Sequence, residues 1–235
     1  MHFSIRTIPI LPWGMLNAFL VTGPGGTILV DTGLPGSERT IDRALQAEGL
    51  GWQDIKLIIL THGHIDHAGS AANIRRLSGA QVLYHAAETD YCMGKKPILR
   101  PTRLFGRLFR LTGAIERPFP PVTADIAVEG KTFDLETLGL SGTVLHTPGH
   151  TTGSVSLMLP SGDVLAGDLA ASGILLGGIA LRGRPERPPF EEDPRIVAGS
   201  LEELLSAGAV RFHLGHGGPL GAKAIANHVR RLKRS

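Results

Sequence analysis

Cysteine is almost missing from this chain of 235 residues, in which Cys92 is the only one. A single thiol excludes a disulfide framework within the chain and is typical of a reducing compartment. Long apolar runs are missing too, and even residues 173–181 fall far short of the roughly 20 residues that span a bilayer. The first 14 residues lack the basic and then apolar layout of a secretory signal. We therefore expect a cytoplasmic protein without stable membrane insertion.

Aromatic residues make up only 5% of the chain, and they do not alternate with basic residues in the way expected for stacking on nucleic-acid bases. The formal net charge of +3 is modest. We therefore expect a small-molecule substrate and no nucleic-acid partner. A hydrophobic content of 42% with 19% charged residues is typical of a folded globular protein.

Apolar stretches of strand length recur along the chain, with helical segments between and after them. Strand patterns occupy much of 17–33, 56–60, 81–86, 143–166 and 211–214, and helix patterns occupy 37–49, 70–79, 193–208 and 222–235. This order predicts an α+β fold in which two sheets pack face to face with helices outside. No change of composition divides the chain, so we expect a single domain over residues 1–235.

One short stretch, KLIILTHGHIDHAGS at 56–70, carries the strongest chemical signal. His62 and His64 follow an apolar strand and, being two residues apart, project to the same side of an extended segment. Asp66 and His67 follow as the chain turns toward a helix. Imidazole and carboxylate groups are ligands that suit zinc and related ions, so this stretch predicts a metal site.

Three further strand ends offer ligands of the same kind. His150, Asp168 and His216 each follow an apolar run and a small residue. Taken alone, each would be assigned to a cap or a turn. Together with the first cluster, they are candidates for the same metal site.

These motifs run from VDTG at 30–33 to GHGGP at 215–219, in the order typical of the metallo-β-lactamase superfamily, which the chain resembles. The resemblance implies a four-layer αβ/βα sandwich of two mixed β-sheets flanked by helices, with the site at the strand ends. It also implies that one metal is held by His62, His64 and His150, and a second by Asp66, His67 and His216. Asp168 would bridge the two metals, and Asp31 of VDTG would support the site from behind.

The number of ligands agrees with that division. Seven side chains are too many for one tetrahedral zinc, which takes four ligands including water. We expect two Zn²⁺ per chain, with Fe or Mn as alternatives, and a metal-bound hydroxide that attacks a carbonyl. Asp66 is the candidate catalytic residue, because it could also accept a proton during the attack.

The remaining histidines are expected to be structural. His146 and His213 lie on the strands that lead to His150 and His216, either in the core or hydrogen-bonded to a ligand. His228 is expected at the surface.

Residues 90–121 look like a basic amphipathic insertion. Residues 95–113 contain six lysines and arginines and no acid, while Leu104, Phe105, Leu108 and Phe109 recur at helical spacing. Either this apolar face packs over the sandwich, or the segment is a lid that shapes the pocket and attracts an anionic substrate.

Other pocket contacts are expected from three places. Tyr91 in the insertion could reach a substrate oxyanion, and Trp13 and Met15 are candidate apolar contacts in the loop 9–17. The stretch 170–192 is expected to complete the wall.

The resemblance leaves several chemistries open, because members of the superfamily use this kind of site for different reactions. Only about 20 residues follow His216, so we expect no helical C-terminal domain like that of glyoxalase II-like enzymes. We expect a stand-alone lactonase or thioesterase that attacks an ester-like carbonyl. An iron-dependent persulfide dioxygenase, with one iron on His62, His150 and Asp168, stays open. So do a phosphodiesterase, a β-lactamase and a metal-binding module without catalysis. A homodimer is also left open.

Overall fold

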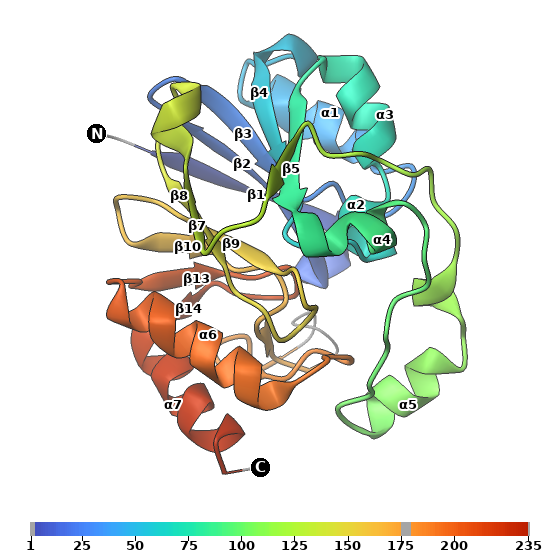
Figure 1. Ribbon diagram of the computed structural model, residues 1–235, viewed down its shortest axis with the longest axis vertical. Helices are drawn as coiled ribbons and strands as arrows, with labels where there is room; N and C mark the ends of the chain where they lie inside the picture. Colours follow the sequence, from blue (N-terminus) through green and yellow to red (C-terminus); the bar gives the residue numbers. More distant parts are fainter. Residues whose placement is uncertain (1–2, 175–179, 235) are drawn as a thin grey trace.

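Two mixed six-stranded sheets form the centre of the computed structural model, which describes residues 3–174 and 180–234 (Figure 1). The first sheet has the order β1 to β6: β1 (Ser4–Leu11), β2 (Leu16–Gly23), β3 (Gly26–Val30), β4 (Ile55–Ile59), β5 (Gln81–His85) and β6 (Ile126–Val128). The second has the order β14-β13-β10-β9-β8-β7: β7 (Thr132–Asp134), β8 (Thr143–His146), β9 (Val155–Met158), β10 (Asp163–Leu165), β13 (Arg211–His213) and β14 (Leu220–Gly221). β11 (Ala171–Ser172) and β12 (Pro185–Glu186) form a small separate pair.

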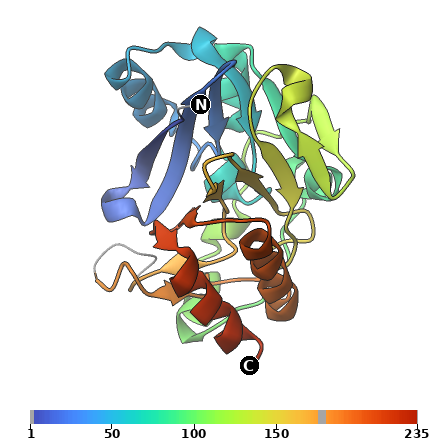
Figure 2. The same cartoon turned by 90° about the vertical axis from the view of Figure 1, so that its left-hand side faces the viewer.

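The helices lie outside the sheets and in the loops. They are α1 (Glu38–Ala47), α2 (Ile65–Ala68), α3 (Ala71–Ser78), α4 (Thr89–Cys92), α5 (Leu104–Arg110), α6 (Pro194–Ser206) and α7 (Ala222–Leu232). Short 3₁₀ turns occur at Pro12–Gly14, Trp52–Asp54, Ala86–Glu88, Ala114–Glu116 and Leu135–Leu138. Figure 2 shows α6 and α7 side by side, at the opposite end of the molecule from α1.

Alternating side chains explain why the two sheets stack. In β3, Ile28 and Val30 enter the core between the sheets, where they join Leu157 and Leu165 of the second sheet. Leu29, between them, points to the other face and packs with the helices α1 and α3. On the far side, α6 and α7 cover the outer face of the second sheet. The predicted α+β fold of two mixed sheets flanked by helices is therefore confirmed.

The helix expected over 193–208 is present as α6. Asp193 caps it, because its Oδ1 accepts hydrogen bonds from the backbone N–H groups of Arg195 at 2.8 Å and Ile196 at 3.3 Å. Pro194 occupies the first helical position, where a backbone N–H is not needed.

The amphipathic helix α5 does not pack its leucines over the two sheets, which was one of the two arrangements expected for it. Leu104 is 70% exposed and Leu108 is 58% exposed, so the leucine stripe does not lie on the sandwich. The helix instead approaches the rest of the molecule through Gly106, where an added Cβ would lie 2.2 Å from the Pro189 carbonyl oxygen. Figure 1 shows α5 extended away from the two sheets.

The topology brings the candidate ligands to one edge of the sheets. β3 and β4 are parallel neighbours, so Asp31 and Thr61, which follow them, emerge side by side. β10 and β13 are also parallel neighbours, which does the same for Asp168 and His216. No helix within residues 3–174 and 180–234 combines the length and apolar character required to cross a bilayer.

Candidate metal centre

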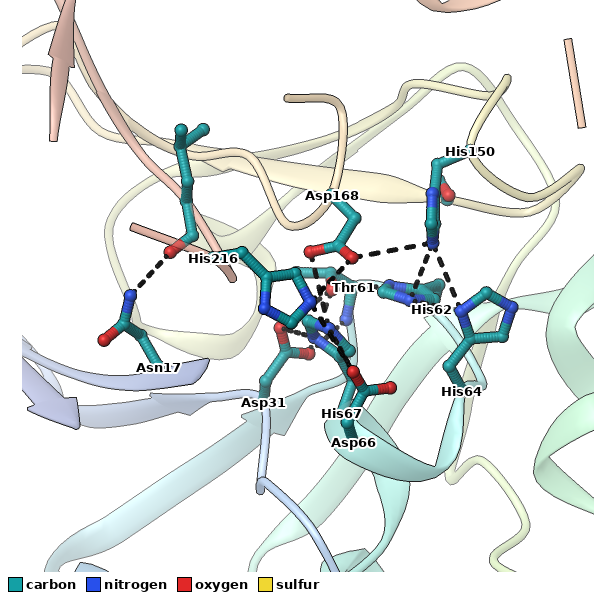
Figure 3. Close-up of polar contacts among 12 residues, drawn as sticks. Asn17, Asp31, Thr61, His62, His64, Asp66, His67, His150, Asp168 and His216 are labelled. Atoms are coloured by element: carbon teal, nitrogen blue, oxygen red, sulfur yellow. Dashed lines mark hydrogen bonds and ion pairs between the residues drawn. The ribbon is translucent and has the colours of Figure 1, made fainter. Parts of the chain in front are cut away.

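Three buried histidines converge on one point (Figure 3). His62 Nε2 lies 3.1 Å from His64 Nδ1, and His150 Nε2 lies 3.1 Å from His62 Nε2 and 3.2 Å from His64 Nδ1. Zn–N bonds of about 2.0–2.1 Å in a tetrahedron would place the nitrogens about 3.3 Å apart. The spacing of the three nitrogens therefore fits a zinc ion.

The tautomer of His62 supports the same interpretation. Thr61 Oγ1 donates to Asp31 Oδ2 at 2.8 Å, so it accepts the bond from His62 Nδ1–H at 3.1 Å. The lone pair of His62 then lies on Nε2 and points at the other two rings. Nε2 of His62 therefore has no proton to donate to the other rings, and its lone pair is available to bind a cation.

A second group of three, Asp66, His67 and His216, lies beside the first. His216 Nε2 is 3.5 Å from Asp66 Oδ2, and His67 Nε2 is 3.9 Å from the same oxygen. Asp66 Oδ1 and His67 Nε2 are buried and have no hydrogen-bond partner among the described residues. These unpaired atoms would be satisfied by a second cation.

Asp168 stands between the two groups. Its Oδ1 is 3.4 Å from His67 Nε2, while its Oδ2 is 3.1 Å from His216 Nε2 and 3.7 Å from His150 Nε2. One carboxylate thus faces candidate ligands of both groups, as a bridging ligand would.

Backbone and carboxylate groups behind the rings orient the second group. His67 Nδ1 donates to Asp31 Oδ2 at 2.7 Å, and His216 Nδ1 donates to the Met15 carbonyl at 2.5 Å. Both rings therefore present Nε2 to the centre. Asp31 adopts φ 60°, which is uncommon for a non-glycine residue and is held here by Thr61 and His67.

Glycine is required close to the centre at position 215. A Cβ there would lie 2.4 Å from Asp168 Oδ1 and 2.6 Å from His67 Cε1. The small residue before His216 thus lets the backbone pass the candidate ligands.

Glu88 was not among the candidates, although it connects two ligand loops. It is fully buried, and its Oε2 accepts from Gly63 N at 2.7 Å, between His62 and His64. Its Oε1 accepts from Thr151 Oγ1 at 2.7 Å and Gly153 N at 2.8 Å, just after His150. Its position after the strand 81–85, at the ligand edge of the sheet, was the signal that could have identified it.

Electrostatics divide the centre into two parts. Burial, together with neighbouring histidines, lowers the pKa of His64 to about 3 and that of His62 well below its usual value. Burial also lowers the pKa of His150 to about 4, against the opposing charge of Asp168. These three rings are therefore neutral near pH 7 and have lone pairs available for a metal.

The second part favours positive charge. Burial alone would lower the pKa of His216, but Asp168 and Asp66 outweigh it and raise the pKa to about 10. The pKa of Asp168 is held well below its usual range, because His216 and His67 outweigh the effect of burial. The carboxylates that hold protons on these histidines would also attract a divalent cation.

Comparison with known proteins identifies the family. The family model described as Metallo-beta-lactamase superfamily matches residues 11–216, a range that contains all of the candidate ligands. The chain belongs to the metallo-beta-lactamase superfamily.

Individual members of the superfamily resemble the chain along most of its length. It is 31% identical over 232 residues to the probable metallo-hydrolase YflN of Bacillus subtilis, covering 91% of this chain and 83% of that protein. It is 31% identical over 214 residues to a hydroxyacylglutathione hydrolase of Methylobacillus flagellatus, covering 89% of this chain but only 65% of that enzyme.

Solved structures of the superfamily share the fold. A metallo-beta-lactamase family protein from Thermus thermophilus aligns with a TM-score of 0.67 at 24% identity, covering 99% of this chain and 79% of that one. A metallo-beta-lactamase from Cronobacter sakazakii aligns with a TM-score of 0.63 at 27% identity, covering 93% of this chain and 85% of that one.

A cavity of about 160 Å³ opens beside the candidate ligands of this superfamily member. His64, Asp66, His150, Asp168 and His216 form its polar side. The opposite wall is apolar and is built from residues of several segments: Leu11, Met15, Leu34, Phe109, Ile115 and Phe190. None of the described residues that line it is a lysine or an arginine.

Only some of the residues that were expected to contact a substrate line this cavity. Met15 lines it, whereas Trp13 is 64% exposed and lies outside it. Tyr91 is buried but does not line the cavity, because its hydroxyl donates to Glu192 Oε1 at 3.1 Å. Residues 175–179 of the expected wall 170–192 lie outside the described residues, while Pro189 and Phe190 of that stretch line the cavity.

His146 and His213 were expected either in the core or hydrogen-bonded to a ligand, and the structure shows them hydrogen-bonded to groups other than candidate ligands. His146 Nε2 donates to the Thr152 carbonyl at 2.9 Å. His213 Nε2 lies 3.0 Å from Asp163 Oδ1. These histidines therefore hold loops and strands rather than the metal centre.

Proposed function

We propose that this chain is a dinuclear metal-dependent hydrolase that acts on an ester-like carbonyl, in a lactone or a thioester. The observation that carries the proposal is the placement of Asp168, whose two oxygens face two separate groups of buried ligand atoms. The name of the hydroxyacylglutathione hydrolase relative supports a thioester, and the superfamily supports hydrolase chemistry in general.

The residues have distinct roles in this proposal. His62, His64 and His150 would hold one cation, Asp66, His67 and His216 the other, and Asp168 both. A bound pair of cations would supply a Lewis acid for the carbonyl and a water that ionises near neutral pH. Asp66, whose Oδ2 faces His67 and His216, would also accept a proton during the attack.

The cavity favours a neutral and partly apolar substrate. Its wall opposite the ligands is formed by side chains such as Met15, Leu34 and Phe109. The described lining residues include no lysine or arginine, so the wall opposite the ligands offers no counter-charge to an anionic substrate. An acyl group next to the scissile carbonyl would bury apolar area against this wall.

A substrate panel tests the proposal. Purified, metal-assayed protein would be supplied with N-acyl homoserine lactones, glutathione thioesters, a phosphodiester and a chromogenic β-lactam. We expect the highest kcat/KM on a lactone or a thioester. We also expect Asp168→Ala and His64→Ala to lower it by at least about a thousandfold, because each removes a ligand of the site.

Two matched variants serve as controls. Asp163→Asn changes an aspartate on the strand that leads to Asp168, and His146→Ala changes a histidine outside the centre. Both are expected to keep activity within a few fold. Preference for the phosphodiester, or one iron per chain with oxygen uptake on a persulfide, would contradict the proposal.

A further inference from the structure

A second cavity, of about 210 Å³, is lined by four arginines, one histidine, one glutamate and two apolar residues: Arg103, Arg184, Arg187, Arg231, His228, Glu186, Pro185 and Leu232. We call it the arginine pocket. Its residues come from the segment before α5, from the chain around β12, and from α7. None of the described residues that line it also lines the cavity at the metal centre.

Two carboxylates neutralise part of the positive charge of the arginine pocket. Glu186 is shared, since its Oε2 lies 2.6 Å from Arg103 Nη1 and its Oε1 lies 3.0 Å from Arg184 Nε. Buried Glu191 forms an ion pair with Arg187. Four guanidinium groups against these two carboxylates leave an excess of two positive charges.

Arg231 has no carboxylate partner among the described residues. Its Nη2 donates to the Pro185 carbonyl at 2.9 Å and contacts His228 Nδ1 at 3.4 Å. Because a guanidinium can only donate, Nδ1 of a neutral His228 accepts and the ring proton lies on Nε2.

Two buried donors of the arginine pocket are left without an acceptor. His228 is only 3% exposed, against the expectation of a surface position, and its Nε2 has no hydrogen-bond partner among the described residues. The Nε of Arg187 has none either. Burial and the charges of Arg231, Arg187 and Arg103 lower the pKa of His228 to about 4, so the ring stays neutral near pH 7. Unpaired buried donors are costly, and a bound anion would satisfy them.

We propose that the arginine pocket binds the dianionic phosphate group of a small molecule or of free phosphate. The excess of two positive charges matches a phosphate dianion, and donors from three segments match a tetrahedral group better than a planar carboxylate. A bound phosphate would also tie Arg103, which precedes α5, to α7. It would thereby steady the helix that carries Phe109 into the wall of the metal-centre cavity.

A binding measurement on the whole, metal-assayed protein tests this site independently of the proposed hydrolase activity. Isothermal titration with inorganic phosphate would be compared for the unchanged protein, Arg231→Gln and Arg230→Gln. Arg230 is the neighbouring, exposed arginine of α7, whose guanidinium contacts Asn227 rather than the arginine pocket. Phosphate could also bind at the metal centre, which all three proteins share, so only the difference between the two variants reports on this pocket.

We expect Arg231→Gln to weaken phosphate binding about tenfold, the loss of one charge-assisted hydrogen bond, and Arg230→Gln to leave it unchanged. A thermal shift with phosphate, absent with chloride at equal ionic strength, is expected alongside. Tighter binding of adenosine monophosphate that is also lost in Arg231→Gln would support the site and identify the source as a phosphorylated molecule. Equal phosphate binding by both variants, or a shift that chloride reproduces, would overturn the proposal.

Discussion

Glu88 shows how a residue that touches no candidate ligand side chain can control the geometry of two ligand loops. Its two oxygens accept bonds from Gly63 on one loop and from Thr151 and Gly153 on the other. The first loop carries His62 and His64, and the second carries His150. Loss of this carboxylate would let the two loops separate while all ligand side chains remain present.

We predict that Glu88→Ala weakens zinc binding by about 10–100-fold, the usual cost of removing support behind a metal ligand. Glu88→Gln should recover part of the affinity, because its amide oxygen can still accept one of the bonds. Zinc affinity would be measured by competition with a chromogenic chelator. Asp90→Asn, an exposed acid two residues away that pairs with Lys95, is the control. Zinc affinity in Glu88→Ala equal to that of the control would show that the carboxylate does not hold the loops.

Single residues also show what the sequence could predict about the site. His62, His150, Asp168 and His216 were recognisable because each follows an apolar strand, and the ends of parallel strands meet at one edge. The metal-ligand roles themselves stay predictions. Glu88 was missed because its one signal, a position just after the strand 81–85, is shared by many surface residues in turns.

The burial of single polar residues could not be predicted from the sequence either. His228 lies on the amphipathic helix α7, and its burial depends on the chain around β12, which approaches from far away in the sequence. Helical spacing within 222–235 contains no information about that approach. The partners of His146 and His213 depend in the same way on contacts between segments.

At the scale of elements, the amphipathic pattern predicted the packing of α5 poorly. Helical spacing correctly indicated a helix, yet the residue that is buried is Gly106 and not the leucines. At Gly106 the helix backbone packs against the backbone of another segment. The spacing of apolar residues does not predict such a contact. What the helix contributes to the metal-centre cavity is Phe109, which stacks on Phe190.

We predict that Phe109→Ala raises KM for substrates with a long acyl chain several fold more than for those with a short one. The reason is that Phe109 forms part of the apolar wall, and its removal exposes that wall to water. Steady-state kinetics on an acyl series would measure this, with metal content unchanged. Leu108→Ala is the control, because Leu108 is an exposed residue of the same helix and does not line the cavity. An equal change for both variants, or for all chain lengths, would exclude a contact between Phe109 and the acyl group.

On the scale of the whole molecule, the candidate metal centre joins the two sheets. His62, His64, Asp66 and His67 follow β4 of the first sheet, while His150, Asp168 and His216 follow strands of the second. The layers and helices could be predicted because strands and helices have clear periodicities and the motif order is typical of the superfamily. The positions of α5 and of the arginine pocket could not, because they depend on contacts between loops.

The most direct test of the central claim is a titration of metal-stripped protein with Zn²⁺ that counts the ions bound to each chain. Two groups of ligand atoms that share Asp168 predict two ions in the unchanged protein, and fewer than two tightly bound ions in Asp168→Ala. Because both sheets supply ligands, the melting temperature should rise as zinc is added. Binding of one ion or none by the unchanged protein would contradict the account.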